Sequence, residues 1–286
     1  MDLVQWFVAP LTHAFMVKAV LVSMLVGVVC SVLSCYMTLK GWALMGDAVS
    51  HAVMPGVVIA YILKIPFAIG AFVFGVGSVL AIGFIKAQTR IKEDTAIGIV
   101  FTGFFALGLV LVSKTPSSVD LTHILFGNVL GISNQDILQT IIISAITLIT
   151  IALCRKDLLL FCFDPTHARS IGLNTTALYY TLLSLLSLTA VAGLQTVGII
   201  LVVAMLVTPG ATAYLLTDRF DHMLGIAIGS GVISSVLGTY MSYHLDGATG
   251  GCIVVLQTFL FILAMIFAPK HGLIAKARLQ RQQQPS

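Results

Sequence analysis

The chain has 286 residues, of which 58% are hydrophobic and only 9% are charged, and its formal net charge is +4. A soluble domain carries about 25% charged residues, so this composition excludes a soluble enzyme and predicts one domain that crosses a membrane several times. None of the five cysteines forms a C-x-x-C pair, which argues against a disulfide framework and against a thiolate zinc site.

Apolar runs long enough to cross a bilayer recur along the whole chain. The run nearest the N-terminus has neither the preceding basic segment nor a clear cleavage site of a signal peptide, so we expect it to be retained. Seven predicted spans are well separated in the sequence, at about 15–39, 42–63, 67–85, 95–113, 137–153, 223–243 and 252–268.

The stretch 177–217 contains no charged residue. As one helix it would be about 60 Å long, twice the thickness of the hydrocarbon core, so it must turn back. The segment Gly193–Gly198 is the expected place, either as a tight turn between two full spans or within a broken, re-entrant helix. We expect Thr208-Pro209-Gly210 to kink or end the second half. The predicted fold class is therefore an all-α polytopic membrane helix bundle with eight or nine spans.

The distribution of basic residues predicts the orientation. If the loop that holds Lys86, Arg90 and Lys92 is cytoplasmic, alternation of the spans puts twelve of the fifteen basic residues inside, as the positive-inside rule requires. The stretch 154–175 and the tail 269–286 are then cytoplasmic. With nine spans, the N-terminus lies outside.

The segment Gly46–Gly56 contains two ionisable residues inside a predicted span. Asp47 is the only acidic residue, and His51 the only histidine, that we place well within an apolar run. At positions i and i+4 they share one helix face, and such residues in a span usually line an ion pathway. The alternative is that they pair with each other and only lock a helix.

A carboxylate and an imidazole on one helix face provide half of a divalent-metal site. Without a thiolate, these ligands suit Mn²⁺ and Fe²⁺ and permit Zn²⁺. Ser50 and Met54 lie on the same face; Ser50 could supply a hydroxyl or orient Asp47, whereas Met54 is expected to serve packing. Two ligands are too few for tight binding, which favours a transient transport site or one completed by other helices or a second subunit.

Small residues recur on the predicted span 223–243. Gly225 and Gly229 form a G-x-x-x-G motif, and Gly231, Ser235 and Gly238 follow. Small faces let helices approach closely. We expect packing within the bundle, with a homodimer interface as the alternative.

Several segments resemble those of the permease subunits of metal-type ABC importers, most closely the manganese and iron branch. The segment 46–56 is similar to the family signature, and the similarity continues at 92–99, at Asp164–Leu173, at 198–213 and at 247–254. It therefore covers essentially the whole chain.

The resemblance implies a complex in a bacterial inner membrane. Two permease subunits, identical or different, and two ATPase subunits would import a metal that an extracytoplasmic binding protein delivers. Asp47 and His51 match the positions expected to contact the metal. The loop 164–173 matches the docking segment for the ATPase, with Asp164 as a helix N-cap and Ala168 and Gly172 on one face. The resemblance implies no resident cofactor and no nucleic acid partner.

The chain contains no phosphate-binding G-x-x-x-x-G-K-[ST] motif. We therefore expect a permease subunit that is not itself an enzyme, with ATP hydrolysed by a separate polypeptide. Two alternatives remain open, a zinc-preferring member of the same family and a metal transporter or channel driven by an ion gradient. An intramembrane metalloprotease is disfavoured, because the only glutamate, Glu93, lacks the H-E-x-x-H context.

Overall fold

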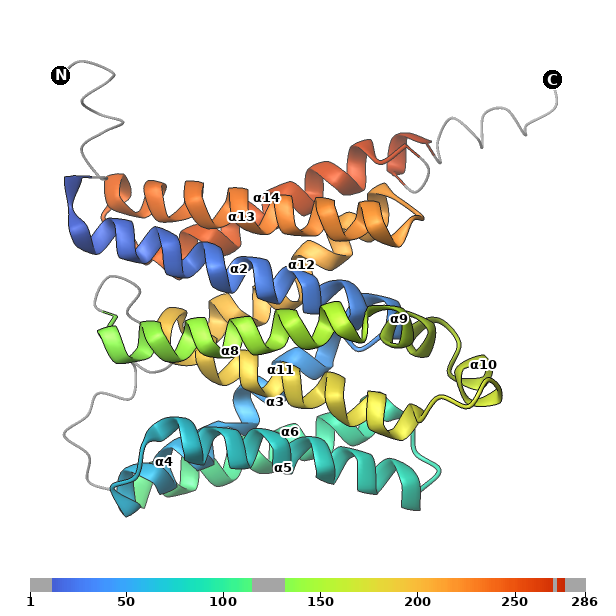
Figure 1. Cartoon of the computed structure of the whole chain (residues 1–286). Coiled ribbons are helices and arrows are strands. Elements are labelled where there is room, and N and C mark those ends of the chain that lie inside the picture. The colour runs from blue at the N-terminus through green and yellow to red at the C-terminus, as the bar shows by residue number, and fades with distance from the viewer. Residues whose placement is uncertain (1–11, 115–131, 270–271, 276–286) are drawn as a thin grey trace, which may run out of the picture. The chain divides into compact units, whose positions relative to one another are not determined.

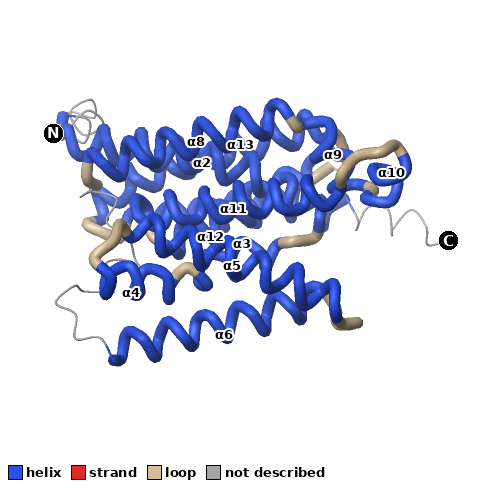
Figure 2. The backbone as a smooth tube through the Cα atoms, turned by 60° about the horizontal axis from the view of Figure 1, so that its bottom comes forward, coloured by secondary structure: helices blue, strands red, loops and turns tan. Residues whose placement is uncertain are grey.

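The structure is a computed structural model, and it describes residues 12–114, 132–269 and 272–275. In these ranges the regular structure is helical and contains no strand (Figure 2), which confirms the predicted all-α class. Residues 1–11, residues 115–131 and most of the tail 269–286 lie outside the described residues.

Nine helices or helix pairs in the described ranges are long and apolar enough to cross a membrane. This number of candidate spans agrees with the larger of the two predicted numbers. They are α2 (Ala14–Lys40), the pair α3 (Ala43–Ala52) and α4 (Met54–Leu63), α5 (Phe67–Gln88), α6 (Glu93–Lys114), α8 (Asn134–Leu153), α11 (Thr175–Val197), α12 (Ile199–Leu216), α13 (Phe220–Leu245) and α14 (Thr249–Phe267); the shorter α9 (Arg155–Phe163) and α10 (Pro165–Ser170) lie between α8 and α11.

Local capping sets several of the helix ends. Gly41 ends α2 with φ at +73°, and its N–H bonds back to the carbonyls of Met37 and Thr38. Ser133 accepts the N–H of Asp136 at 3.1 Å at the start of α8. Small polar residues and glycine therefore act at these ends as their preferences predict.

The uncharged stretch 177–217 turns at Gly198. This residue has φ at +87°, which only glycine adopts readily, and it separates the last residue of α11 from the first of α12. A Cβ atom added to Gly193 would lie 2.4 Å from a methyl group of Val202, so the two helices pack closely beside the turn. This stretch therefore forms two helices that are each long enough to span a bilayer, and the choice between two full spans and a re-entrant helix stays a prediction.

Pro209 lies inside α12 and does not end it. Ser34 of α2 accepts the N–H of Gly210 at 2.9 Å and donates to the carbonyl of Val207 at 3.1 Å. Proline removes one helical hydrogen bond and disturbs those around it, and a serine from a neighbouring helix can satisfy the groups that are freed. These hydrogen bonds explain why α12 continues through Pro209, although the sequence also allowed the helix to end there.

The contacts group the described residues into two compact units. The first holds 12–41, 132, 204–269 and 272–275, and the second holds 42–114 and 133–203. Helix α12 contributes residues to both. Whether the chain acts as a single permease domain stays a prediction.

In the first unit, α13 packs against both α2 and α14, and α2 and α13 run side by side in Figure 1. Gly231 and Gly238 are in close contact with Ser31 and Ile253 respectively. A Cβ added to Gly225 or Gly229 would meet no described atom within 4 Å. Packing among the described residues therefore uses the later small residues of α13, and a homodimer interface at Gly225 and Gly229 stays a prediction.

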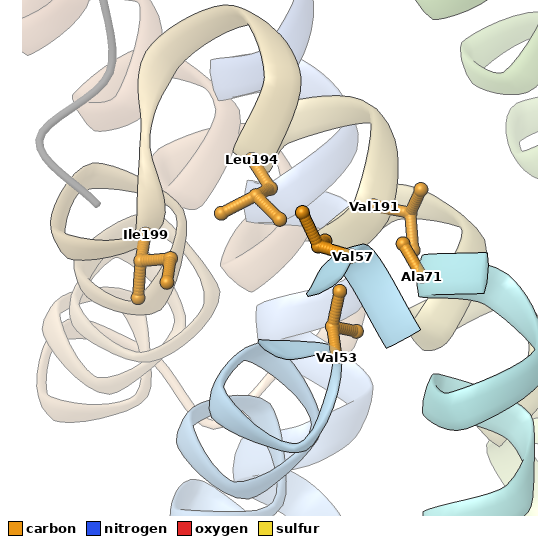
Figure 3. Packing of buried hydrophobic residues seen from close by; sticks show 6 residues of the cluster. All are labelled: Val53, Val57, Ala71, Val191, Leu194 and Ile199. Carbon is orange, nitrogen blue, oxygen red and sulfur yellow. The ribbon is translucent and has the colours of Figure 1, made fainter. Parts of the chain in front are cut away.

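In the second unit, α4, α5 and α6 contact one another, and α11 packs on α3, α5 and α8. Buried side chains at the junction of α3 and α4 meet those of α5 and α11. Figure 3 shows this cluster, which consists of Val53, Val57, Ala71, Val191, Leu194 and Ile199. The apolar cluster fixes the junction that carries the two ionisable residues.

Candidate metal site

The helix that carries Asp47 and His51 is interrupted immediately after them. Helix α3 ends at Ala52, and α4 begins at Met54 with Pro55 in its first turn. In a continuous helix the N–H of residue 55 would bond to the carbonyl of His51, but proline has no N–H to donate. The sequence therefore places a helix break within one turn of His51 and within two turns of Asp47.

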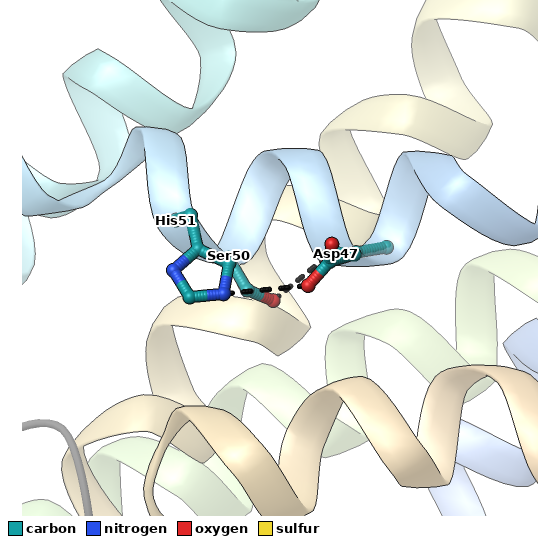
Figure 4. Close-up of polar contacts among 4 residues, drawn as sticks. Asp47, Ser50 and His51 are labelled. Carbon is teal, nitrogen blue, oxygen red and sulfur yellow. Dashed lines mark hydrogen bonds and ion pairs between the residues drawn. The ribbon is translucent and has the colours of Figure 1, made fainter. Parts of the chain in front are cut away.

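Asp47 and His51 lie on the same face of α3, and their side chains approach each other (Figure 4). The distance between Asp47 Oδ1 and His51 Nε2 is 3.3 Å, and the two side chains are 39% and 25% exposed, respectively. With metal–ligand bonds of about 2.0–2.2 Å, this separation corresponds to a ligand–metal–ligand angle of about 100°. One ion can therefore bind both atoms with little rearrangement.

Ser50 and Met54 are both engaged in packing or backbone contacts. The hydroxyl of Ser50 is buried and donates to the carbonyl of Gly46 at 2.8 Å, so its hydrogen is not directed at Asp47. A Cβ added to Gly108 would lie 3.1 Å from the Cβ of Met54. The packing role predicted for Met54 is confirmed.

Two aromatic residues of α6 contact His51, and the sequence interpretation missed them. The ring centroids of Phe101 and Phe105 each lie 5.4 Å from that of the imidazole. The only signal in the sequence was that the two phenylalanines are four residues apart in an apolar span, which is a common pattern. It gives no indication of the helix that they face.

The pair does not belong to a larger ligand cluster in the described part of the chain. No group of three or more histidine, cysteine, aspartate or glutamate side chains is arranged there to hold a metal ion. Two protein ligands fit a site that binds an ion transiently and takes its remaining ligands from water or from another molecule.

The comparison with protein families decides the class. The model described as the ABC 3 transport family matches residues 12–268. The chain belongs to this family. It is thus a membrane subunit of an ABC transport system and a multi-pass membrane protein, as the sequence predicted.

Similar proteins extend over nearly the full length of this ABC 3 family chain. It is 68% identical to the manganese transport system membrane protein MntB of Synechocystis sp., over 95% of this chain and 89% of the relative. It is 53% identical to a probable iron transport system membrane protein of Haemophilus influenzae, over 92% and 97% of the two chains. The solved structure of PsaBC from Streptococcus pneumoniae in complex with Fab matches with a TM-score of 0.86 at 37% identity, and the match covers 99% of this chain and 100% of that one.

The loop predicted to reach the ATPase forms a short helix, α10, in this ABC permease subunit. Asp164 caps it, because its Oδ1 accepts the N–H groups of Thr166 and His167, each at 2.9 Å; the predicted N-cap is confirmed. Ala168 is fully buried. Gly172 is exposed, lies beyond the helix end and has φ at +89°.

Ala168 and Gly172 therefore do not share one helix face, which corrects the geometric part of that expectation. The physical reason is that α10 ends at Ser170, so the spacing of four residues no longer implies a common face. The exposed apolar side chains beside α10 are Phe163 and Ile171, which are 74% and 57% exposed.

Proposed function

We propose that this chain is the permease subunit of an ATP-driven importer that carries Mn²⁺ or Fe²⁺, with Asp47 and His51 as the protein ligands along the pathway. The observation that carries the proposal is the 3.3 Å separation of Asp47 Oδ1 and His51 Nε2 on a broken span. One oxygen and one nitrogen donor suit these two metals, and the similar proteins named above are manganese and iron transport proteins.

The weakness of a two-ligand site is useful for transport. An ion must bind well enough to enter and weakly enough to leave. A binding protein outside the membrane would release the metal to the mouth of the permease, where Asp47 and His51 replace part of its hydration shell. Movement of the helices around the site would then open it towards the cytoplasm.

The segment around α10 is the proposed contact with a separate ATPase subunit. Asp164 caps the start of this helix, and the buried Ala168 packs against the rest of the chain. The exposed Phe163 and Ile171 are the side chains available to a partner on either side of it. Gly172 allows the sharp turn that leads into α11, since a residue with a Cβ atom is strained at this φ.

The proposed orientation places α10 and the C-terminus in the cytoplasm of a bacterium, because twelve of the fifteen basic residues then lie inside. An odd number of spans puts the N-terminus outside. We propose that the permease pairs with a second one, either a copy of itself or a related chain. Gly225 is exposed and Gly229 is half-buried, and because a Cβ on either would meet no described atom within 4 Å, the two glycines provide one surface on which close helix packing is sterically possible.

The decisive experiment is uptake of radioactive Mn²⁺, Fe²⁺ and Zn²⁺ by cells that lack their other importers. Asp47→Ala should abolish uptake while the complex still assembles, whereas Asp94→Ala, which removes an exposed carboxylate at the start of α6, should behave as wild type. Wild-type uptake in Asp47→Ala would refute the role of the site. Zinc uptake that exceeds the other two would assign the metal to the zinc alternative, and transport in liposomes without any ATPase would favour the gradient-driven one.

A further inference from the structure

Two phenylalanine rings pack on the imidazole of His51. Phe101 and Phe105 lie one helical turn apart on α6, and their rings stack at 6.0 Å with an interplanar angle of 18°. Both meet the imidazole edge to face, at interplanar angles of 66° and 84°. This T-shaped arrangement is the favourable one for aromatic rings, so the two contacts restrict the plane of the imidazole.

Helix packing holds these two rings in place. Helix α6 contacts α3 and α4, and a Cβ added to its Gly108 would lie 3.3 Å from the ring of Pro55. On the side of α5, Phe104 packs on Phe74 with the ring centroids 5.8 Å apart. Contacts of α6 with α3, α4 and α5 therefore position the half-buried phenyl rings beside the break that follows the site.

The second nitrogen of His51 lacks the partner that a metal-binding histidine usually has. Nε2 is the atom near Asp47, whereas Nδ1 is buried and has no hydrogen-bond partner among the described residues. When Nε2 binds a metal, Nδ1 carries the ring hydrogen. Metal-binding histidines almost always donate this hydrogen to a carboxylate, a carbonyl or water, which orients the ring and makes it a stronger ligand.

We propose that Phe101 and Phe105 are positioning residues for transport. They hold the imidazole of His51 by aromatic contacts in place of a hydrogen-bonded partner, so that Nε2 stays directed at Asp47 while metal binding stays weak. The inference rests on the proposed function, since it takes His51 as a ligand of the transported ion. It adds the reason why the ion leaves the site readily.

The first test supplies the missing acceptor. In Phe101→Gln and in Phe105→Gln, a side-chain carbonyl replaces one phenyl ring next to the imidazole. Since loss of such a partner typically weakens metal binding about 10–100-fold, we expect at least one variant to lower the Kd for Mn²⁺ about tenfold. The same variant should transport more slowly, because release becomes harder. If the rings served only to support the fold, the glutamine substitutions would weaken Mn²⁺ binding and slow transport together.

The second test removes the rings. The double variant Phe101→Leu with Phe105→Leu keeps the apolar volume but frees the imidazole plane, so we expect the Kd to rise several-fold. Phe84→Leu is the matched control, because Phe84 on α5 is 66% exposed, and it should bind and transport as wild type. The Kd is measured by titrating the purified complex with Mn²⁺ alone under electron paramagnetic resonance, and the rate is measured in liposomes.

The inference is overturned if neither glutamine variant changes the Kd while His51→Ala loses Mn²⁺ binding; the proposed function would survive that result. Wild-type binding in His51→Ala would overturn both, since His51 would then not be a ligand.

Discussion

Among the described membrane helices, α4 and α12 each contain a proline, and the outcomes differ. At Pro55 the span divides into α3 and α4, whereas at Pro209 the helix α12 continues. The difference lies in the neighbours, because Ser34 bonds to the backbone on both sides of Pro209. A serine from a neighbouring helix can thus satisfy backbone groups that a proline disturbs, whereas the carbonyl of His51, which loses its helical donor at Pro55, accepts the N–H of Val53. The break is the one next to Asp47 and His51.

The largest expected effect comes from repairing the break. Pro55→Ala restores the N–H that can bond to the carbonyl of His51 and removes a residue that costs about 3 kcal/mol inside a helix. We expect α3 and α4 to join, the ligand pair to shift and Mn²⁺ uptake per assembled complex to fall at least about tenfold. A 1 Å misplacement of reacting groups costs about 100-fold in enzymes, which sets the scale.

Thermal unfolding separates this effect from damage to the fold. Pro55→Ala should have an equal or higher Tm than the wild type. A lower Tm together with lost uptake would contradict the account, because it would show that the proline supports the fold and not the site.

The second-largest effect is expected on the stability of the fold, from a substitution at Gly210, the residue after Pro209. A Cβ added to Gly210 would lie 2.5 Å from the backbone oxygen of Ser34, so Gly210→Ala must push α2 and α12 apart. Overpacking of this kind costs about 1–3 kcal/mol. We expect a lower Tm and less assembled complex in the membrane, measured by thermal unfolding and by blotting. An unchanged Tm would mean that the two helices are not in close contact.

A smaller loss is expected for Ser34→Ala. It removes the acceptor for the Gly210 N–H and the donor to the Val207 carbonyl. Side-chain hydrogen bonds between membrane helices contribute about 0.6 kcal/mol on average, so the Tm should fall slightly while uptake per assembled complex stays near the wild-type value. Ser34→Thr, which keeps the hydroxyl, is the control; equal losses in both variants would point to packing instead of the hydrogen bonds.

The smallest effect is expected for Pro209→Ala, the direct counterpart of Pro55→Ala. The helix already continues through this position, so a regained N–H should change uptake less than about twofold and stabilise the helix slightly. Uptake assays of the two alanine variants side by side test the contrast. A loss of uptake as large as that of Pro55→Ala would remove the distinction between the two prolines.

The sequence predicted the all-α class, the candidate spans and the proximity of Asp47 and His51 because each depends on a local pattern, whereas the role of this pair as metal ligands stays a proposal. Apolar length defines a span, and a spacing of four residues puts Asp47 and His51 on one face. The turn near Gly198 was located to within a few residues because 177–217 is too long for one crossing. Asp164 was recognisable as an N-cap from its position before Pro165.

What the sequence could not predict depends on contacts between distant segments. The sequence around Phe101 and Phe105 does not indicate that they face His51. The sequence around Pro209 does not indicate a hydrogen bond from Ser34, which lies 173 residues away from its partner Val207. The prediction that Ala168 and Gly172 share one helix face was wrong for a local reason, because it assumed that α10 continues past Ser170. The periodicity of the sequence alone predicts neither the contacts between distant helices nor the residue at which a helix ends.

The most direct test of the central claim is pulsed electron paramagnetic resonance on the purified complex with Mn²⁺ bound. The account predicts a coupling between the metal and one imidazole nitrogen in the wild type, and its loss in His51→Ala with Asp47 still present. A nitrogen coupling that survives in His51→Ala, or a wild-type spectrum with oxygen ligands only, would contradict the assignment of this pair as the metal site.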